Sequence, residues 1–112
     1  MKARRLDALV EASRDPDPGI RKVAVRELCP CVIKTNDARA WDRVLELTRD
    51  SNRDVRRIAL HTIIDGSPRS REPDVVRALD AMRNDPDRRL RRNVRKILAR
   101  HRATGRINSG AH

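Results

Sequence analysis

Basic side chains recur at fixed positions in this 112-residue chain and are the first candidates for chemistry. Two series have a spacing of 35 residues: Lys22, Arg57 and Arg92, and Arg26, His61 and Lys96. Cationic groups in register favour the binding of carboxylates or phosphates. A solvated charged face without a ligand is the alternative interpretation.

The other reactive residue types form no convincing catalytic or metal-binding pattern. Cys29-Pro30-Cys31 is half of a metal site at most, because a structural zinc ion needs four ligands and the three histidines are scattered. A small buried thiol is the preferred interpretation of Cys29, which shares its repeat position with Ile64 and Ala99, and a redox role of Cys29 and Cys31 is left open. The chain also lacks a glycine-rich phosphate loop, a nucleophile elbow and paired catalytic carboxylates. We therefore expect no enzyme activity, no metal and no cofactor.

Composition narrows the class of protein further. The chain has 27 Lys and Arg against 16 Asp and Glu, a net charge of +11, and its aromatic content is 1%. Trp41 is its one aromatic residue, which excludes the stacking platform that binds single-stranded nucleic acid. No apolar run approaches the ~20 residues of a membrane span, and the N-terminus has no apolar signal-peptide region. We expect a soluble cytoplasmic protein with reduced cysteines and no membrane contact.

The positive charge is concentrated near the C-terminus. Residues 1–82 hold 17 basic and 14 acidic residues, whereas residues 83–112 hold 10 basic and 2 acidic residues. Their net charges are +3 and +8. Because like charges on one helix repel, such a cluster suits an anionic partner. Simple capping of a terminal helix is the other explanation.

A 35-residue period organises the whole chain. Asp15, Asp50 and Asp85 mark it, and aliphatic residues and arginines follow each aspartate at matching distances. Each unit contains two amphipathic helical patterns separated by a turn rich in Asp, Asn and Pro. The predicted helices cover 2–13, 18–29, 37–49, 53–65, 72–83 and 88–102.

This pattern resembles the HEAT repeat. Asp15-Pro16-Asp17 forms the turn, and the second helix then has a hydrophobic residue, Arg21, Ala24 and Leu28. The third unit has the same turn with Val94 in the alanine position, whereas the middle unit departs at Ser51 and Asn52. The resemblance implies an all-α, right-handed α-solenoid of three helix pairs. The expected repeats are 2–30, 37–65 and 72–102, followed by a flexible tail over 103–112.

The resemblance also implies roles for individual residues. Second helices usually line the concave side of such a solenoid, which would place the basic series in a groove. Arg21, Arg56 and Arg91 are expected to form a structural ladder, because arginine at this position usually bonds carboxylates and carbonyl groups of the turns. Asp17, Asn52 and Asp87 are the expected acceptors.

The sequence therefore predicts an adaptor that presents a basic face to an acidic protein or peptide. Nucleic acid, held by phosphate contacts to this face and the last helix, is the alternative. The flanks expected at the two ends of the array are polar or small, so we expect a three-repeat monomer that forms no obligate dimer. The candidate partner-binding residues are Lys22, Arg26, Arg57, His61, Arg89, Arg92, Arg95 and Lys96.

Overall fold

The computed structural model describes residues 2–29, 37–66 and 68–107, and this part of the chain is helical with no strand. These described residues contain six α-helices and one short 3₁₀ helix, η1. Their bounds are α1 Lys2–Ala12, α2 Pro18–Glu27, α4 Ala38–Leu47, α5 Arg53–Gly66, η1 Arg69–Arg71, α6 Glu72–Met82 and α7 Arg88–Thr104. The predicted helices are confirmed to within one or two residues at their ends, and η1 is an addition.

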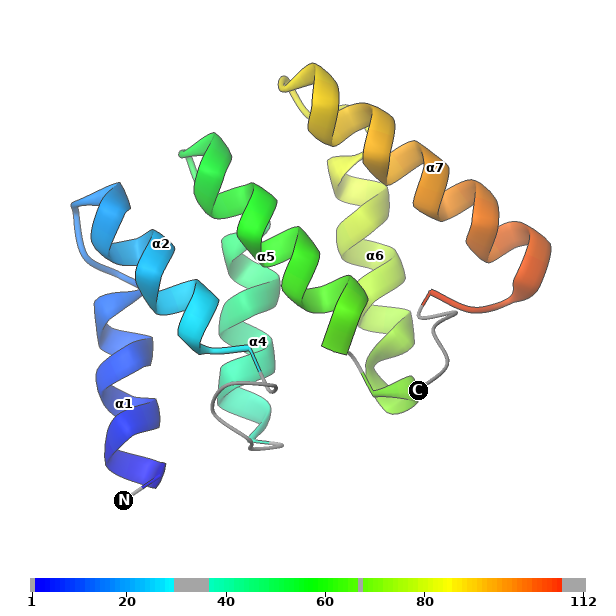
Figure 1. Cartoon of the computed structure of the whole chain (residues 1–112). Helices are drawn as coiled ribbons and strands as arrows, with labels where there is room; N and C mark the ends of the chain where they lie inside the picture. Colours follow the sequence, from blue (N-terminus) through cyan, green and yellow to red (C-terminus); the bar gives the residue numbers. More distant parts are fainter. Residues whose placement is uncertain (1, 30–36, 67, 108–112) are drawn as a thin grey trace.

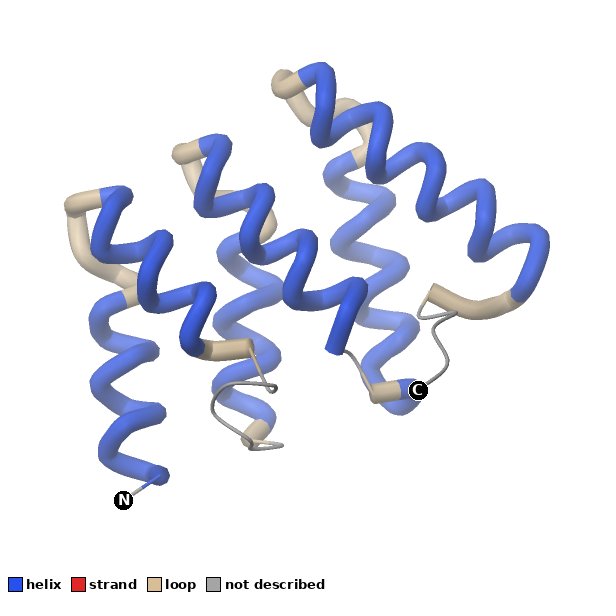
Figure 2. Tube along the Cα trace, in the orientation of Figure 1, coloured by secondary structure: helices blue, strands red, loops and turns tan. Residues whose placement is uncertain are grey.

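The helices form three antiparallel pairs that stack side by side in two layers (Figure 1). One layer contains the first helices α1, α4 and α6, and the other contains the second helices α2, α5 and α7. The turns inside the three pairs lie at the same end of the array (Figure 2). This arrangement confirms the predicted small α-solenoid.

Turn residues fix where the second helices begin. Asp17 caps α2 by accepting from the Gly19 N–H at 2.8 Å, and Asp87 caps α7 by accepting from the Leu90 N–H at 3.0 Å. In the middle repeat, the Asn52 side chain accepts from the backbone N–H groups of Asp54 and Val55. Such caps satisfy N–H groups that have no partner within the helix.

The repeat positions differ in exposure according to whether a neighbouring repeat covers them. Val55 and Ile58 on α5 are buried, whereas Ile20 and Val23, at the equivalent positions of α2, are 43% and 51% exposed. The first edge of the array, formed by the outer side of the α1–α2 pair, is therefore partly apolar. This differs from the expectation of polar or small flanks at both ends. The last edge has exposed charges at Asp80 and Arg95, where earlier repeats have Leu45 and Leu60.

Arginine–aspartate pairs join successive repeats at the turns. Arg21 forms two hydrogen bonds to the Asp50 carboxylate, Nε to Oδ1 at 2.9 Å and Nη2 to Oδ2 at 3.0 Å, while its Nη1 donates to the carbonyl oxygens of Asp15 and Pro16. The hydrogen bond with Asp50 raises the pKa of Arg21 above its ordinary value. Arg56 repeats this geometry with the Asp85 carboxylate. We call these two pairs the arginine–aspartate ladder.

The acceptors in the ladder differ from the expected ones. The carboxylates belong to the aspartates that begin the turns, Asp50 and Asp85, whereas Asp17 and Asp87 cap helices instead. The reason is geometric: Asp17 and Asp87 each direct a carboxylate oxygen to an N–H group at the start of their own helix, and the ladder arginine of the preceding repeat meets the first aspartate of the turn. Asp87 approaches a different arginine of the preceding repeat, Arg53, at 3.6 Å. Arg91 bonds the Asp85 carbonyl oxygen at 2.8 Å and forms no ion pair among the described residues.

The C-terminal segment also departs from the prediction of a flexible tail that begins at 103. Helix α7 continues to Thr104, and Gly105 ends it in the left-handed conformation with φ 73°. Ile107 then packs into the core at 2% exposure, and its N–H donates to the Glu72 carboxylate at 3.1 Å. The remainder of the expected tail, 108–112, lies outside the described residues.

We predict that Asp50→Ala lowers the free energy of unfolding by about 2–3 kcal/mol, because it leaves the largely buried guanidinium of Arg21 without its carboxylate. Asp7→Ala is the matched control, because Asp7 forms an exposed pair with Arg39, and we expect a loss below about 1 kcal/mol. Chemical denaturation followed by Trp41 fluorescence measures both. Equal losses would contradict a structural role for the ladder.

Candidate basic binding face

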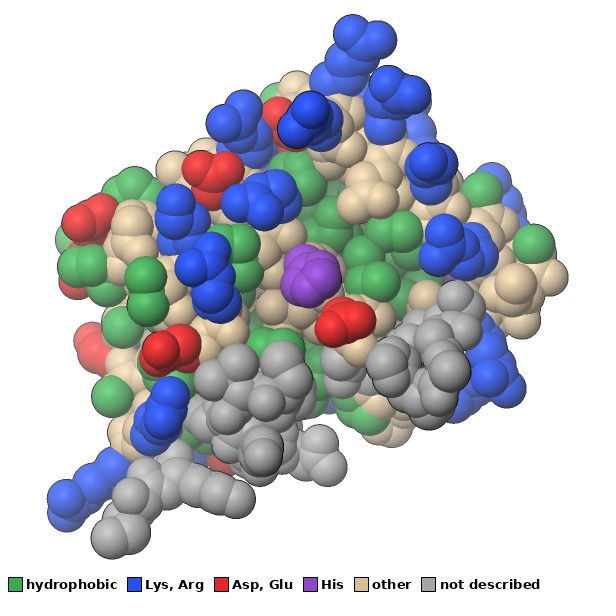
Figure 3. All heavy atoms as spheres, in the orientation of Figure 1, with side chains coloured by type: hydrophobic (Ala, Val, Ile, Leu, Met, Phe, Trp, Pro, Cys, Tyr) green, Lys and Arg blue, Asp and Glu red, His purple; other side chains and the backbone are tan. Residues whose placement is uncertain are grey.

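The second-helix layer presents most of the predicted basic residues on one surface. Figure 3 shows Lys and Arg side chains over α2, α5 and α7, with a histidine near the centre of the view and hydrophobic side chains between α5 and α7. We define the basic face by seven of the eight predicted residues and one further arginine. These are Lys22, Arg26, Arg57, His61, Arg89, Arg92, Lys96 and Arg100.

A pocket of about 420 Å³ lies between α2 and α5. Arg26 from α2 and the pair Arg57 and His61 from α5 line it, so the structure brings together residues that are far apart in the sequence. Ile58 and Cys29 contribute apolar surface to the same pocket. The pocket therefore combines cationic and apolar groups.

A second pocket of about 380 Å³ lies between α5 and α7. Arg57 and His61 line this pocket too, opposite Lys96 and Arg100 on α7. Its apolar lining consists of Leu60, Ile64 and Ile97. Together with the hydrophobic surface visible between these helices in Figure 3, this gives a groove with apolar walls and cationic groups.

Carboxylates interrupt the basic face near the start of α5 and α7. A third pocket, also of about 380 Å³, is lined by Arg57 and Arg89 together with Asp54 and Asp87. Arg57 approaches Asp54 at 3.8 Å, a long and exposed contact that leaves the guanidinium open to a ligand. Arg57 lines all three pockets and is the central residue of the face.

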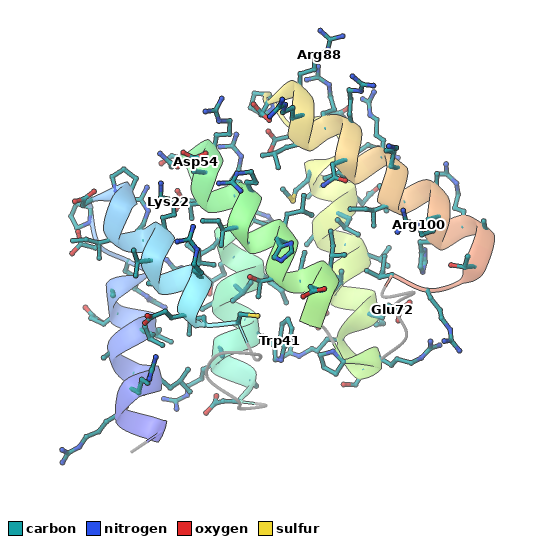
Figure 4. All side chains as sticks on the ribbon, in the orientation of Figure 1. Lys22, Trp41, Asp54, Glu72, Arg88 and Arg100 are labelled. Carbon is teal, nitrogen blue, oxygen red and sulfur yellow. The ribbon has the colours of Figure 1, made fainter. Side chains whose placement is uncertain are left out.

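Arg95 does not belong to the basic face, contrary to prediction. Its Nε donates to the Arg83 carbonyl oxygen and its Nη2 to the Asn84 side chain, both at 3.1 Å. These bonds hold Arg95 against the turn between α6 and α7, at the last edge of the array. Its position is equivalent to Leu60, which packs toward the next repeat. Lys22 lies on the α2 surface (Figure 4) and is half-buried.

Arg100 and Asp65 line the pockets but are not among the predicted partner-binding residues. Arg100 and Asp65 stand four residues after Lys96 and His61, one helical turn further along the same face. Extending the basic series by one turn would have found both. The view in Figure 4 places Arg100 in the second half of α7, whereas Arg88 projects away from the array at the start of the helix.

The first-helix layer has a larger pocket, of about 540 Å³, but two of the three arginines that line it are engaged in ion pairs. Arg71 pairs with Asp42 at 2.9 Å and Asp74 at 3.0 Å, and Arg77 also pairs with Asp74. The hydrogen bond with Asp74 raises the pKa of Arg71. Cations that are already neutralised by carboxylates attract an external anion weakly, so this pocket is the poorer candidate.

Metal-ligating and membrane-spanning features are not found in the described part of the chain. Within 2–29, 37–66 and 68–107, no cluster of His, Cys, Asp and Glu has the arrangement to hold a metal ion. Cys29 is buried, and Cys31 lies outside these ranges. None of the described helices has the length and apolar character to cross a bilayer.

The paired helices, the repeated turns and the ladder agree with a comparison against known families. The protein-family model described as HEAT repeats matches residues 6–102. The chain belongs to the HEAT-repeat family. Comparisons with curated proteins and with solved structures gave no match. HEAT repeats typically form non-catalytic scaffolds for protein interactions, which directs attention to the exposed faces of this array.

We predict that the double variant Arg57→Glu with Arg92→Glu keeps the HEAT fold, because both side chains are exposed and neither forms a bond of the ladder. The free energy of unfolding should change by less than about 1 kcal/mol. Far-UV circular dichroism and chemical denaturation check this expectation. Loss of helicity would show that these arginines support the fold.

Proposed function

We propose that this HEAT-repeat chain is a non-enzymatic adaptor whose basic face binds an acidic protein segment, and that it acts as a single three-repeat unit at micromolar concentration. The observation that supports this most is the position of Arg57, which lines three pockets spread over both grooves of the second-helix layer. A segment that crosses α2, α5 and α7 would meet cationic groups in each groove. Its carboxylates would bind these groups through charge-assisted hydrogen bonds.

The apolar walls of the grooves favour a protein segment over a nucleic acid backbone. Leu60, Ile64 and Ile97 line the groove between α5 and α7. Burying apolar side chains of a partner against them contributes about 25 cal/mol per Å² of surface removed from water. A sugar–phosphate backbone has no matching apolar surface. An amphipathic helix with acidic flanks satisfies both kinds of surface.

The carboxylates beside the basic face also favour a protein segment over nucleic acid. Asp54, Asp65 and Asp87 line pockets beside the arginines. They would repel a continuous row of phosphates, whereas a protein partner can place a basic or polar side chain at those positions. Interspersed charges of both signs are therefore better suited to selecting one acidic protein segment than to following a nucleic acid strand.

Nucleic acid is a second candidate because of α7. This helix has exposed basic residues along its whole length, and Figure 3 shows a row of Lys and Arg side chains over it. Phosphate contacts of this kind supply affinity without sequence specificity. The exposed residues concerned are Arg88, Arg89, Arg92, Lys96, Arg100 and Arg102.

We predict that a fluorescent amphipathic helical peptide, with leucines on one face and glutamates on its flanks, binds the protein. The Arg57→Glu with Arg92→Glu variant should lower its affinity at least about tenfold, equivalent to about 1.4 kcal/mol, because one exposed cation on α5 and one on α7 then repel the glutamates of the peptide. Fluorescence anisotropy titrations measure the change. No binding by the unmodified protein at low salt would contradict the proposal.

Two controls separate the basic face from net charge. Arg4→Glu with Arg49→Glu makes the same charge change at exposed residues in or beside the first-helix layer and should preserve most of the affinity. A peptide with glutamines in place of the glutamates should bind weakly. Equal losses in the two double variants would mean that long-range charge alone attracts the peptide.

For nucleic acid, we predict only weak binding that depends strongly on salt. Duplex DNA and RNA should be retarded in mobility-shift gels at about 50 mM salt and released at about 200 mM. The logarithm of the affinity should fall with a slope of about −0.9 per phosphate contact for the DNA. Retention of either duplex at the higher salt would favour nucleic acid as the ligand instead of an acidic protein.

A further inference from the structure

The two edges of the array each hold one half of an arginine–aspartate pair. The Asp50 and Asp85 carboxylates each receive the guanidinium of the preceding repeat, but Asp15, the first aspartate of the series, forms no ion pair among the described residues. Arg91, at the other edge, is the arginine of the series without a carboxylate.

Arg91 is held in the same way as the paired arginines. Its Nη1 donates to the carbonyl oxygen six residues earlier, Asp85, at 2.8 Å, just as Nη1 of Arg56 donates to Asp50 and Nη1 of Arg21 donates to Asp15. In the paired arginines, the Nε and Nη2 edge then binds the carboxylate of the following repeat. The equivalent edge of Arg91 is oriented for a carboxylate beyond the array.

The 35-residue period identifies which residues of the last edge would face which residues of the first edge if two copies of the array were stacked in register. Leu60 and Ile97 line one pocket between repeats, and their equivalents at the outer edges are Arg95 and Glu27. Leu45 and Ala78 line another, and Asp80 takes the Leu45 position at the last edge. The first edge has Arg5 one turn before the equivalent of Ala78. The two edges therefore have opposite charges at facing positions. The ion pairs that these residues form within the chain, Arg5 with Glu27 at 3.8 Å and Asp80 with Arg83 at 3.4 Å, are exposed and weak.

The first edge also has apolar surface that is covered in the other repeats. Ile20 and Val23 are the exposed large hydrophobic residues of the described chain, and their equivalents Val55 and Ile58 are buried where α2 packs on α5. If another helix packed on α2 in the way that α2 packs on α5, it would cover Ile20 and Val23. The aliphatic part of a neighbouring arginine such as Arg95 can do so while its charge meets Glu27.

We propose that copies of this chain stack head to tail, with the last edge of one copy on the first edge of the next. The last edge consists of Asp80, Arg91 and Arg95, and the first edge consists of Arg5, Asp15, Ile20, Val23 and Glu27. The bond between Arg91 and Asp15 of the next copy continues the ladder. Because the contact is heterologous, it leads to open-ended stacks rather than closed dimers.

The stacking is expected to be reversible and weak. Exposed ion pairs are screened by salt, and the charges at Asp80 and Arg95 replace the leucines that join repeats within the chain. The protein therefore stays a single unit at micromolar concentration. Stacks form at higher local concentration, for example where many copies gather on one partner.

Sedimentation velocity and small-angle scattering from about 10 μM to about 1 mM protein at low salt test this proposal. The average mass should rise with concentration beyond that of a dimer and fall when salt is added. A constant monomer mass overturns the proposal. A mass that stops at two chains also overturns it, because it indicates a closed, isologous contact.

Charge exchange tests the individual pair. Asp15→Arg and Arg91→Glu should each abolish the rise in mass, and a chain with both changes should recover it, because the pair is then reversed. Arg88→Glu, an equal charge change at an exposed residue of α7, should leave stacking intact. Failure of the double variant to recover while it remains folded overturns the Arg91–Asp15 contact.

Ile20→Glu serves as a variant that leaves the fold untouched, because Ile20 is already exposed. It should abolish stacking while circular dichroism and denaturation midpoint stay as in the unmodified protein. Stacking that survives Ile20→Glu overturns the assignment of this edge. Should Arg91→Glu unfold, the Asp15→Arg and Ile20→Glu variants still decide the proposal.

Discussion

A guanidinium that is held on one side by carbonyl oxygens of its own turn has only its opposite edge to offer to a neighbour. In this protein that constraint sets the placement of successive repeats. Arg21 and Arg56 are anchored to their own turns and bind the first aspartate of the next turn with two parallel hydrogen bonds. Bidentate geometry specifies direction as well as distance, so each pair fixes how one helix pair lies on the next.

The binding face follows from this stacking. With the turns aligned at one end, α2, α5 and α7 form one layer (Figure 1). Cationic residues at equivalent positions of successive repeats therefore lie on neighbouring helices. The same alignment places apolar residues of neighbouring helices in the grooves between them, where Leu60 and Ile97 line a common pocket. Cations beside apolar walls are a consequence of packing thin helix pairs whose cores consist of small aliphatic side chains.

The charges of the two layers have different physical roles. In the first-helix layer, Arg39 and Arg71 bind carboxylates of neighbouring repeats and so act within the fold. On the second-helix layer, Arg57 has only a long contact with Asp54, and so retains a field that extends into solvent. The net charge of +11 is a property of the whole chain and does not describe this difference between the two layers.

The sequence by itself determined the period, the helices and the turns, because helix caps and apolar spacing depend only on residues within each segment. It also indicated which basic residues share the second-helix layer, since a 35-residue repeat transfers one position to the next helix, and their role in binding stays a prediction. The tertiary structure decided which carboxylate each arginine binds. Asp17 and Asp50 are both plausible partners of Arg21 by type, and only the position of the next repeat selects Asp50. The tertiary structure also determined that Arg95 lies at the edge of the array and that Ile107 is buried. Both placements depend on contacts between distant segments, which a local sequence pattern does not contain.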